Sequence, residues 1–221
     1  MDIMATPAIV PYWFIGYNVV LELVFAVIGF LVCYYGYKVY KLSGQKQPRL
    51  FCISFLFIAI AYSIQSVLNL GVLDYFNADI GNTHILYIIG IYLHIFFLLT
   101  GLITLTYMTF KVSNWRIYSL LFVIVMLSIF LSINQLFLFY LLSSILLLYI
   151  CYHYFKNYLE NRQGKTLLVL VAFIFLLFGK IHFLFALDHA TYYAVGHILE
   201  LVAYVLILIN LIMVTRKPWK I

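Results

Sequence analysis

Six ionisable side chains lie within long apolar stretches of this sequence, where a charge is costly. They are two glutamates, one lysine and three histidines: Glu22, His94, Lys180, His182, His197 and Glu200. Near the centre of a membrane such a group costs about 2.5 kcal/mol or more, so it persists where it is paired, hydrated or functional. Six of them in one small chain therefore indicate a site at which chemistry is done.

Imidazole nitrogen and carboxylate oxygen form the usual ligand set of zinc and related ions. His197 and Glu200 are spaced i, i+3 and so share one face of a helix. His94 and His182 would complete a tetrahedral set. A b-type haem would instead take two histidines from facing helices, such as His94 with His182 or His197. The sequence predicts a bound zinc, copper or iron ion or a b-type haem, in a sensory or redox-like role.

Other functions stay open on the same residues. A membrane-embedded zinc hydrolase would use a carboxylate, Glu200 or Glu22, to activate a metal-bound water, although no HExxH motif occurs. A receptor for a small ligand or a proton-coupled transporter would also place histidines and glutamates inside the bundle. Finally, the polar residues could serve only to fix helix packing through hydrogen bonds of about 1 kcal/mol each.

The elements that position these residues are helices long enough to cross a membrane. Hydrophobic residues make up 67% of the chain and charged residues 9%, against roughly 45–50% apolar in soluble domains. The apolar stretches show no period-two alternation, which excludes a barrel and leaves helices. We therefore predict an all-α membrane protein, one domain over 1–221 with seven transmembrane helices and no soluble domain. The expected spans are 11–37, 50–72, 85–109, 116–133, 136–155, 166–187 and 191–214.

Basic residues set the orientation of these spans. With the N-terminus outside and the C-terminus in the cytoplasm, 12 of the 13 lysines and arginines fall in cytoplasmic segments, and the exception is Lys180. The acidic residues Asp2, Asp74, Asp79 and Asp188 fall outside. This is the positive-inside pattern of a multi-pass protein of the cell membrane. The net charge of +6 is thus a topology signal and does not predict nucleic-acid binding.

Counting from the outer end of each span places the six ionisable residues within about 15 Å of that end. Further polar residues share this layer and are expected to support the site: Asn18, Gln65, Asn69 and Tyr204. Lys180 and His182 are two residues apart and face different sides of their helix, so only one of them points squarely into the site. An ion pair between Lys180 and either Glu200 or Glu22 would be the least costly way to keep the lysine there.

The partners follow from the same pattern. The lipid bilayer surrounds the bundle, and no loop is long enough to form a separate output domain, so a signal would pass through a cytoplasmic or membrane partner. The fourth and fifth spans contribute almost nothing to the polar layer. We expect them to face lipid or to form a homo-oligomer contact.

Overall fold

The computed structural model describes residues 12–75, 81–110, 114–187, 189 and 191–216, with the side chains of residues 12, 15, 72–75 and 81–87 excepted. In these residues the chain forms seven α-helices after a 3-10 turn, Tyr12–Phe14. The helices are α1 (Ile15–Ser43), α2 (Lys46–Tyr75), α3 (Gly81–Thr109), α4 (Trp115–Phe130), α5 (Gln135–Asn161), α6 (Gly164–Phe185) and α7 (Thr191–Arg216). The all-helical prediction is confirmed.

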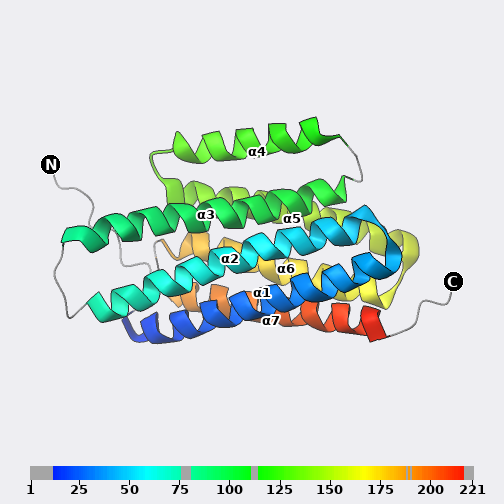
Figure 1. Cartoon of the computed structure of the whole chain (residues 1–221), viewed down its shortest axis with the longest axis horizontal. Coiled ribbons are helices and arrows are strands. Elements are labelled where there is room, and N and C mark those ends of the chain that lie inside the picture. Colours follow the sequence, from blue (N-terminus) through cyan, green and yellow to red (C-terminus); the bar gives the residue numbers. More distant parts are fainter. Residues whose placement is uncertain (1–11, 76–80, 111–113, 188, 190, 217–221) are drawn as a thin grey trace.

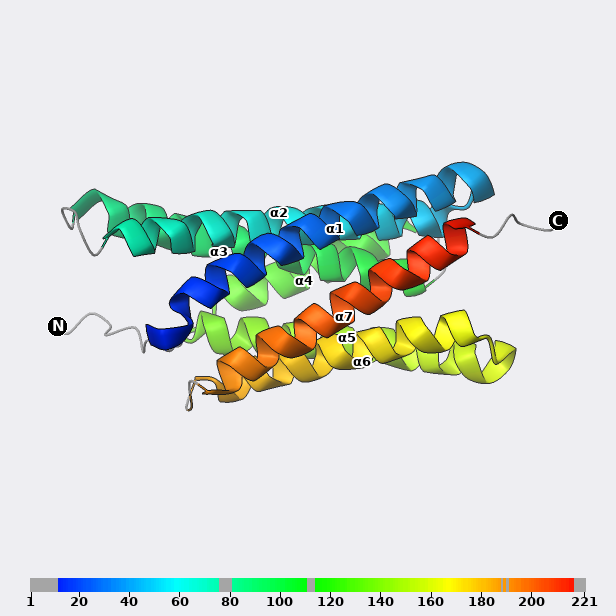
Figure 2. The same cartoon turned by 90° about the horizontal axis from the view of Figure 1, so that it is seen from below.

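Six of the helices pack into a ring. Following contacts from neighbour to neighbour gives the order α1, α2, α3, α5, α6, α7 and back to α1. The first half of the ring is α1–α3 and the second half is α5–α7. Figure 2 shows α1, α2 and α3 on one side, α5 and α6 on the other, and α7 running from α6 at one end toward α1 at the other.

The helix α4 lies outside the ring, against α3 and α5 (Figure 1). Its 16 residues span about 24 Å at 1.5 Å per residue, less than the hydrocarbon core of a bilayer. The other six helices are long and apolar enough to cross a membrane. Six candidate spans are therefore present in the described part of the chain. A seventh crossing by α4, with the orientation of the termini, stays a prediction.

The connection between α4 and α5 falls where the sequence predicts it. The sequence indicates a tight hairpin near residues 132–135, and α4 does end at Phe130 while α5 begins at Gln135. Asn134 caps α5 by accepting a hydrogen bond from the backbone N–H of Phe137 at 3.1 Å. At the other end of α5, the helix extends to Asn161, beyond the expected limit of residue 155. The helix continues beyond the apolar run because its backbone hydrogen bonds do not depend on apolar side chains.

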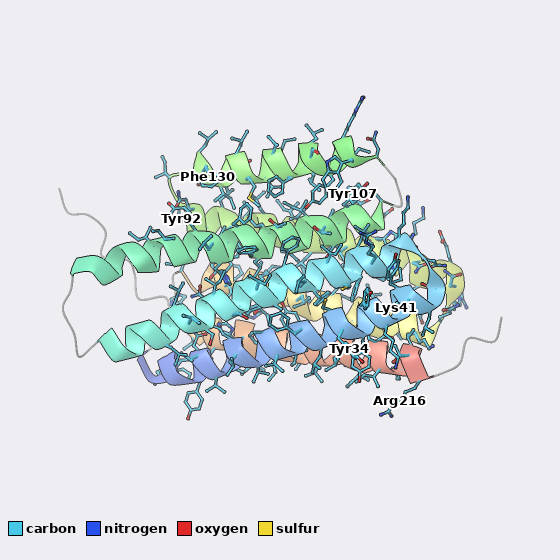
Figure 3. All side chains as sticks on the ribbon, in the orientation of Figure 1. Tyr34, Lys41, Tyr92, Tyr107, Phe130 and Arg216 are labelled. Atoms are coloured by element: carbon cyan, nitrogen blue, oxygen red, sulfur yellow. The ribbon has the colours of Figure 1, made fainter. Side chains whose placement is uncertain are left out.

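Most of the buried side chains of the ring are apolar, and so are most of the side chains on its outer surface. Phe55, Leu99 and Phe173 are fully buried, whereas Val27, Leu120 and many other apolar side chains on every helix are exposed (Figure 3). An apolar exterior of this extent is the surface that lipid covers in a membrane protein.

The charged residues separate along the bundle. Among the residues that the structure describes, every lysine and arginine other than Lys180 lies near one end of the bundle, the basic end. Lys41 and Arg216 mark this end in Figure 3. Asp2, Asp79, Asp188 and the side chain of Asp74 fall outside the described residues.

Small residues bring α1 and α2 close together. A Cβ atom added at Gly29 would lie 2.9 Å from Cβ of Ala59, and one added at Gly36 would lie 3.5 Å from Cβ of Cys52. Between them, Sγ of Cys33 lies 2.9 Å from Sγ of Cys52. This stripe of small residues lets the two backbones approach closely.

Candidate functional site

Glu200 lies at the centre of the ring and connects three helices. Its side chain on α7 is fully buried, and Oε1 lies 2.6 Å from Nζ of Lys180 on α6. Its other oxygen accepts a hydrogen bond of 2.8 Å from the hydroxyl of Tyr62 on α2. Tyr204, one turn further along α7, donates to the Tyr62 hydroxyl at 3.4 Å. The carboxylate therefore connects the first half of the ring to the second.

The Lys180–Glu200 contact is an ion pair rather than a well-directed hydrogen bond. Lys180 is 5% exposed and Glu200 is 0% exposed, so both charges have left water. Removing two charges from water costs several kcal/mol per ion, and their attraction in a low dielectric roughly compensates that cost. Such a pair adds little net stability to the fold. Its presence inside the bundle therefore favours a functional role over a purely structural one.

Two glycines allow the helices that carry this pair to approach. A Cβ added at Gly179 on α6 would lie 3.1 Å from Cγ of Glu200 and 3.2 Å from the carbonyl oxygen of Gly196 on α7. A Cβ at Gly196 would lie 2.8 Å from the ring of Phe183. The backbones of α6 and α7 thus come close enough for Lys180, which follows Gly179, to meet Glu200.

His197 lies beside the pair in an aromatic shell. Its ring stacks between those of Phe14 and Phe25, at centroid distances of 5.9 and 5.8 Å, and meets Phe183 and Tyr193 edge-on at 4.9 and 4.6 Å. Nδ1 lies 3.8 Å from Oε2 of Glu200. Within the described structure neither ring nitrogen has a hydrogen-bond partner. Buried polar groups are nearly always satisfied, so an imidazole without a polar partner is unusual at this position.

Glu22 forms a second buried acidic group, on α1. The side-chain amide of Asn69 on α2 donates to both of its oxygens, at 2.9 and 2.7 Å. One turn before Glu22, Asn18 accepts a hydrogen bond of 3.3 Å from the hydroxyl of Tyr193 on α7. The two polar residues of α1 that were expected in the polar layer are therefore buried, and Glu22 pairs with an amide while Glu200 pairs with the lysine.

His94 on α3 is oriented by the backbone of α2. Its Nδ1 lies 2.9 Å from the carbonyl oxygen of Ala61, and because a carbonyl only accepts, Nδ1 carries the proton in this contact. Nε2, the other ring nitrogen, takes no part in this contact. The imidazole also meets the ring of Tyr62 edge-on at a centroid distance of 5.9 Å, so His94 packs against Tyr62 from the third helix.

The predicted residues do not all assemble in one place. Lys180 faces the site, whereas His182 bonds the carbonyl of Phe178 at 2.7 Å and meets the ring of Tyr192. In the described residues, no group of three or more histidine, cysteine, aspartate or glutamate side chains is arranged to hold a metal ion. Gln65 is half-buried on α2 and takes no part in the contacts described above. Metal or haem binding stays a prediction.

No protein-family model, curated protein or solved structure matches this chain. Its function is therefore argued from the chemistry of these residues.

Some features of the site are not predicted by the sequence. Tyr62 shares a helix face with Gln65 and Asn69, and this spacing predicts that it points inward, but it does not predict the contact with Glu200. Gly179 immediately precedes the only intramembrane lysine. The aromatic shell of His197 carries no such signal, because phenylalanine is common on every helix.

Proposed function

We propose that this chain is a multi-pass membrane protein that takes up and releases a proton at the Lys180–Glu200 pair, and that the change in charge alters the packing of its two halves. In this role the protein is a proton-responsive sensor. The observation that carries the proposal is the position of the Glu200 carboxylate, which is fully buried and holds Lys180 on α6 and Tyr62 on α2 at once.

Protonation of Glu200 would weaken both contacts. A neutral carboxyl group loses the ionic attraction to Lys180, and it becomes a poorer acceptor for the Tyr62 hydroxyl. The Tyr62 contact joins the first half of the ring to the second, so its weakening biases their relative packing. A switch of this kind needs a local change in charge and a pair of helix packings that the charge can favour or disfavour.

An imidazole and two hydroxyl groups surround the carboxylate. His197 Nδ1 lies 3.8 Å from Oε2 of Glu200 and has no hydrogen-bond partner in the described residues. The hydroxyls of Tyr62 and Tyr204 continue the network. Among the described residues, Glu22 on α1, His94 on α3 and Tyr193 on α7 are further ionisable groups that interact electrostatically with the pair.

Infrared difference spectroscopy of the reconstituted protein tests the proposal directly. A step in pH should change the carboxyl C=O stretch, and the change should disappear in Glu200→Gln. The amide I band should shift with it if the helices rearrange. Glu160→Gln, an exposed glutamate on the same protein, is the matched control and should leave both signals unchanged. A carboxyl signal that persists in Glu200→Gln would overturn the proposal.

A second candidate, a metal or b-type haem site using His94 and His197, has one observation in its favour. Metal-bound histidines commonly donate their other ring N–H to a backbone carbonyl, and His94 does so toward Ala61. Purified protein should then carry metal or a Soret band that is lost in His94→Ala and His197→Ala and kept in His189→Ala. Colourless, metal-free protein would eliminate this candidate, and with it a zinc hydrolase acting through Glu200.

A further inference from the structure

A pair of cysteines lies in the contact between α1 and α2. Sγ of Cys33 is 2.9 Å from Sγ of Cys52, and both cysteines are free. The two backbones are close here because Gly36 has no side chain, and a Cβ added there would lie 3.5 Å from Cβ of Cys52. Cys52 comes ten residues before Tyr62 on α2, or about 15 Å along the helix, so the pair is separate from the Glu200 site.

The two sulfurs lie at the outer surface of the helix bundle. Both cysteines are half-buried. On α1, Cys33 directly precedes Tyr34 and lies one turn before Tyr37, and both tyrosines are exposed. On α2, the exposed Leu56 follows Cys52 by one turn. The pair therefore adjoins apolar and aromatic surface that lipid covers, and a reagent dissolved in the bilayer can reach it.

Adjacent thiols are a source of two electrons and two protons, which they release when they form a disulfide. The acceptor must take both electrons, and because the sulfurs adjoin lipid it must dissolve in the bilayer. A quinone meets both conditions, and the exposed rings of Tyr34 and Tyr37 offer it a flat apolar surface beside the sulfurs. We infer that Cys33 and Cys52 form a redox-active dithiol that a lipid-soluble quinone oxidises to a disulfide between α1 and α2.

The reaction balances without any further reactant. One thiol loses its proton, and the thiolate, which is the nucleophilic form, adds to the quinone and forms a C–S bond. The second sulfur, also as a thiolate, attacks the first. This step forms the S–S bond and breaks the C–S bond, whose electron pair stays on the quinone. The two thiol protons end on the quinone oxygens, so each disulfide is formed together with one hydroquinone.

Thiol counting on the reconstituted full chain tests the inference. The probe is a fully substituted ubiquinone analogue, which has no free ring position for permanent addition of a thiol. After denaturation and treatment with a maleimide of high mass, the chain with its three cysteines should carry three labels when reduced and one label when oxidised. Ultraviolet absorbance should show one hydroquinone formed per chain, and dithiothreitol should restore all three labels.

Two results of this experiment would contradict the inference. The first is three labels after quinone treatment, and the second is a disulfide between two chains in place of one within the chain. Hydrogen peroxide tests the route by which the oxidant arrives. It dissolves in water, so at equal concentration it should oxidise the pair more slowly than the quinone does. A faster reaction with peroxide would rule out the quinone as the preferred oxidant.

Single variants place the reaction at this pair. Cys33→Ser and Cys52→Ser should each keep both remaining thiols after quinone treatment and form no hydroquinone. Cys151→Ser, at the buried cysteine of α5, is the matched control and should still lose two thiols. If a variant fails to fold, peptide mapping of the oxidised wild-type chain decides. It should yield a peptide pair cross-linked between positions 33 and 52, and a cross-link to Cys151 instead would contradict the inference.

Discussion

At the residue scale, the ion pair of Lys180, the one buried lysine among the described residues, occupies the centre of the molecule. The sequence predicts an ion pair between Lys180 and Glu200 or Glu22, and the structure forms it with Glu200. Helix periodicity alone does not decide whether Lys180 or His182 faces inward. The two residues lie on different sides of α6, and either side could face the ring interior. The close approach of α6 and α7 at Gly179 decides it.

Replacing Lys180 by methionine should strongly destabilise the protein. The change leaves the Glu200 charge buried without its cation, for which the usual loss is about 3–5 kcal/mol. Unfolding in mixed detergent micelles measures it. The double variant Lys180→Met with Glu200→Gln should recover most of the loss, because no uncompensated charge remains. A single variant as stable as the wild type would contradict the ion pair.

The Tyr62 hydroxyl should matter more than the Tyr204 hydroxyl. Tyr62→Phe removes a hydrogen bond to a charged group, for which about 1.5–3 kcal/mol is typical. Tyr204→Phe removes a longer contact between two neutral hydroxyls, so its effect should be smaller. Thermal unfolding ranks the two variants, and Tyr34→Phe, at an exposed position on α1, serves as the control. The reverse order would show that Tyr62 is not the principal link to Glu200.

At the element scale, the small residues of α1 set the distance to α2. Gly29, Cys33 and Gly36 lie on one face of α1, and this face comes close to Ala59 and Cys52 of α2. The contact between Cys33 and Cys52 was not predicted, since nothing in the spacing of the cysteines specifies the register of one helix against another.

Gly29→Val should separate α1 from α2. The new side chain would overlap Ala59, and overpacking of this kind costs about 1–3 kcal/mol. Gly16→Val is the matched control on the same helix, because a Cβ at Gly16 meets nothing within 4 Å. Thermal stability of the two purified variants compares them. Equal stability of both would contradict the close packing.

At the scale of the whole molecule, the remaining question is how many helices cross the membrane. Cysteines placed at exposed positions and treated with a membrane-impermeant maleimide in intact cells answer it. Trp115→Cys and Glu160→Cys lie toward the basic end, and Ile133→Cys lies in the turn between α4 and α5. We expect labelling at position 133 alone, above the background of the native cysteines. If 115 and 133 respond alike, α4 does not cross.

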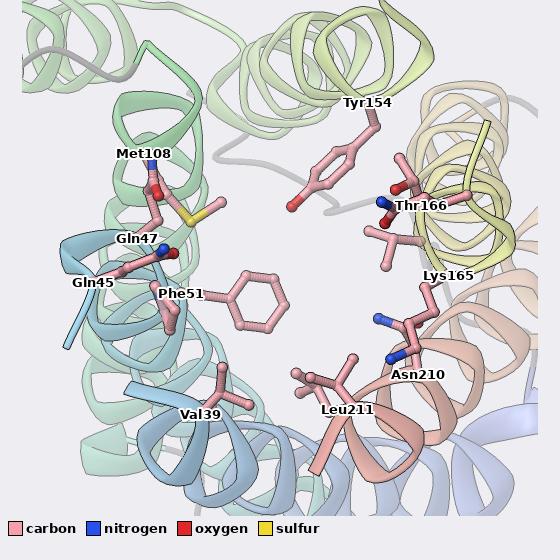
Figure 4. Close-up of a pocket in the computed structure, with 15 residues that line it drawn as sticks. Val39, Gln45, Gln47, Phe51, Met108, Tyr154, Lys165, Thr166, Asn210 and Leu211 are labelled. Carbon is pink, nitrogen blue, oxygen red and sulfur yellow. The ribbon is translucent and has the colours of Figure 1, made fainter. Parts of the chain in front are cut away.

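The sequence predicts the helices and the polar layer because each depends on local apolar length and helix phase. It does not predict the pocket of about 730 Å³ at the basic end, whose lining comes from six helices (Figure 4). Asn210 illustrates the limit: as a lone amide in an apolar helix it resembles a packing residue, and only the assembled ring leaves its Oδ1 buried without a hydrogen-bond partner in the described residues.

The partners of the central ion pair lie on consecutive helices, which has a consequence for biogenesis. A solitary lysine within a nascent helix opposes insertion by about 2.5–3.5 kcal/mol, and a solitary glutamate in the next helix opposes it too. Together, α6 and α7 form a hairpin whose opposite charges neutralise each other. The last two helices should therefore enter the bilayer as a unit, and a chain truncated before α7 should retain α6 poorly in the membrane.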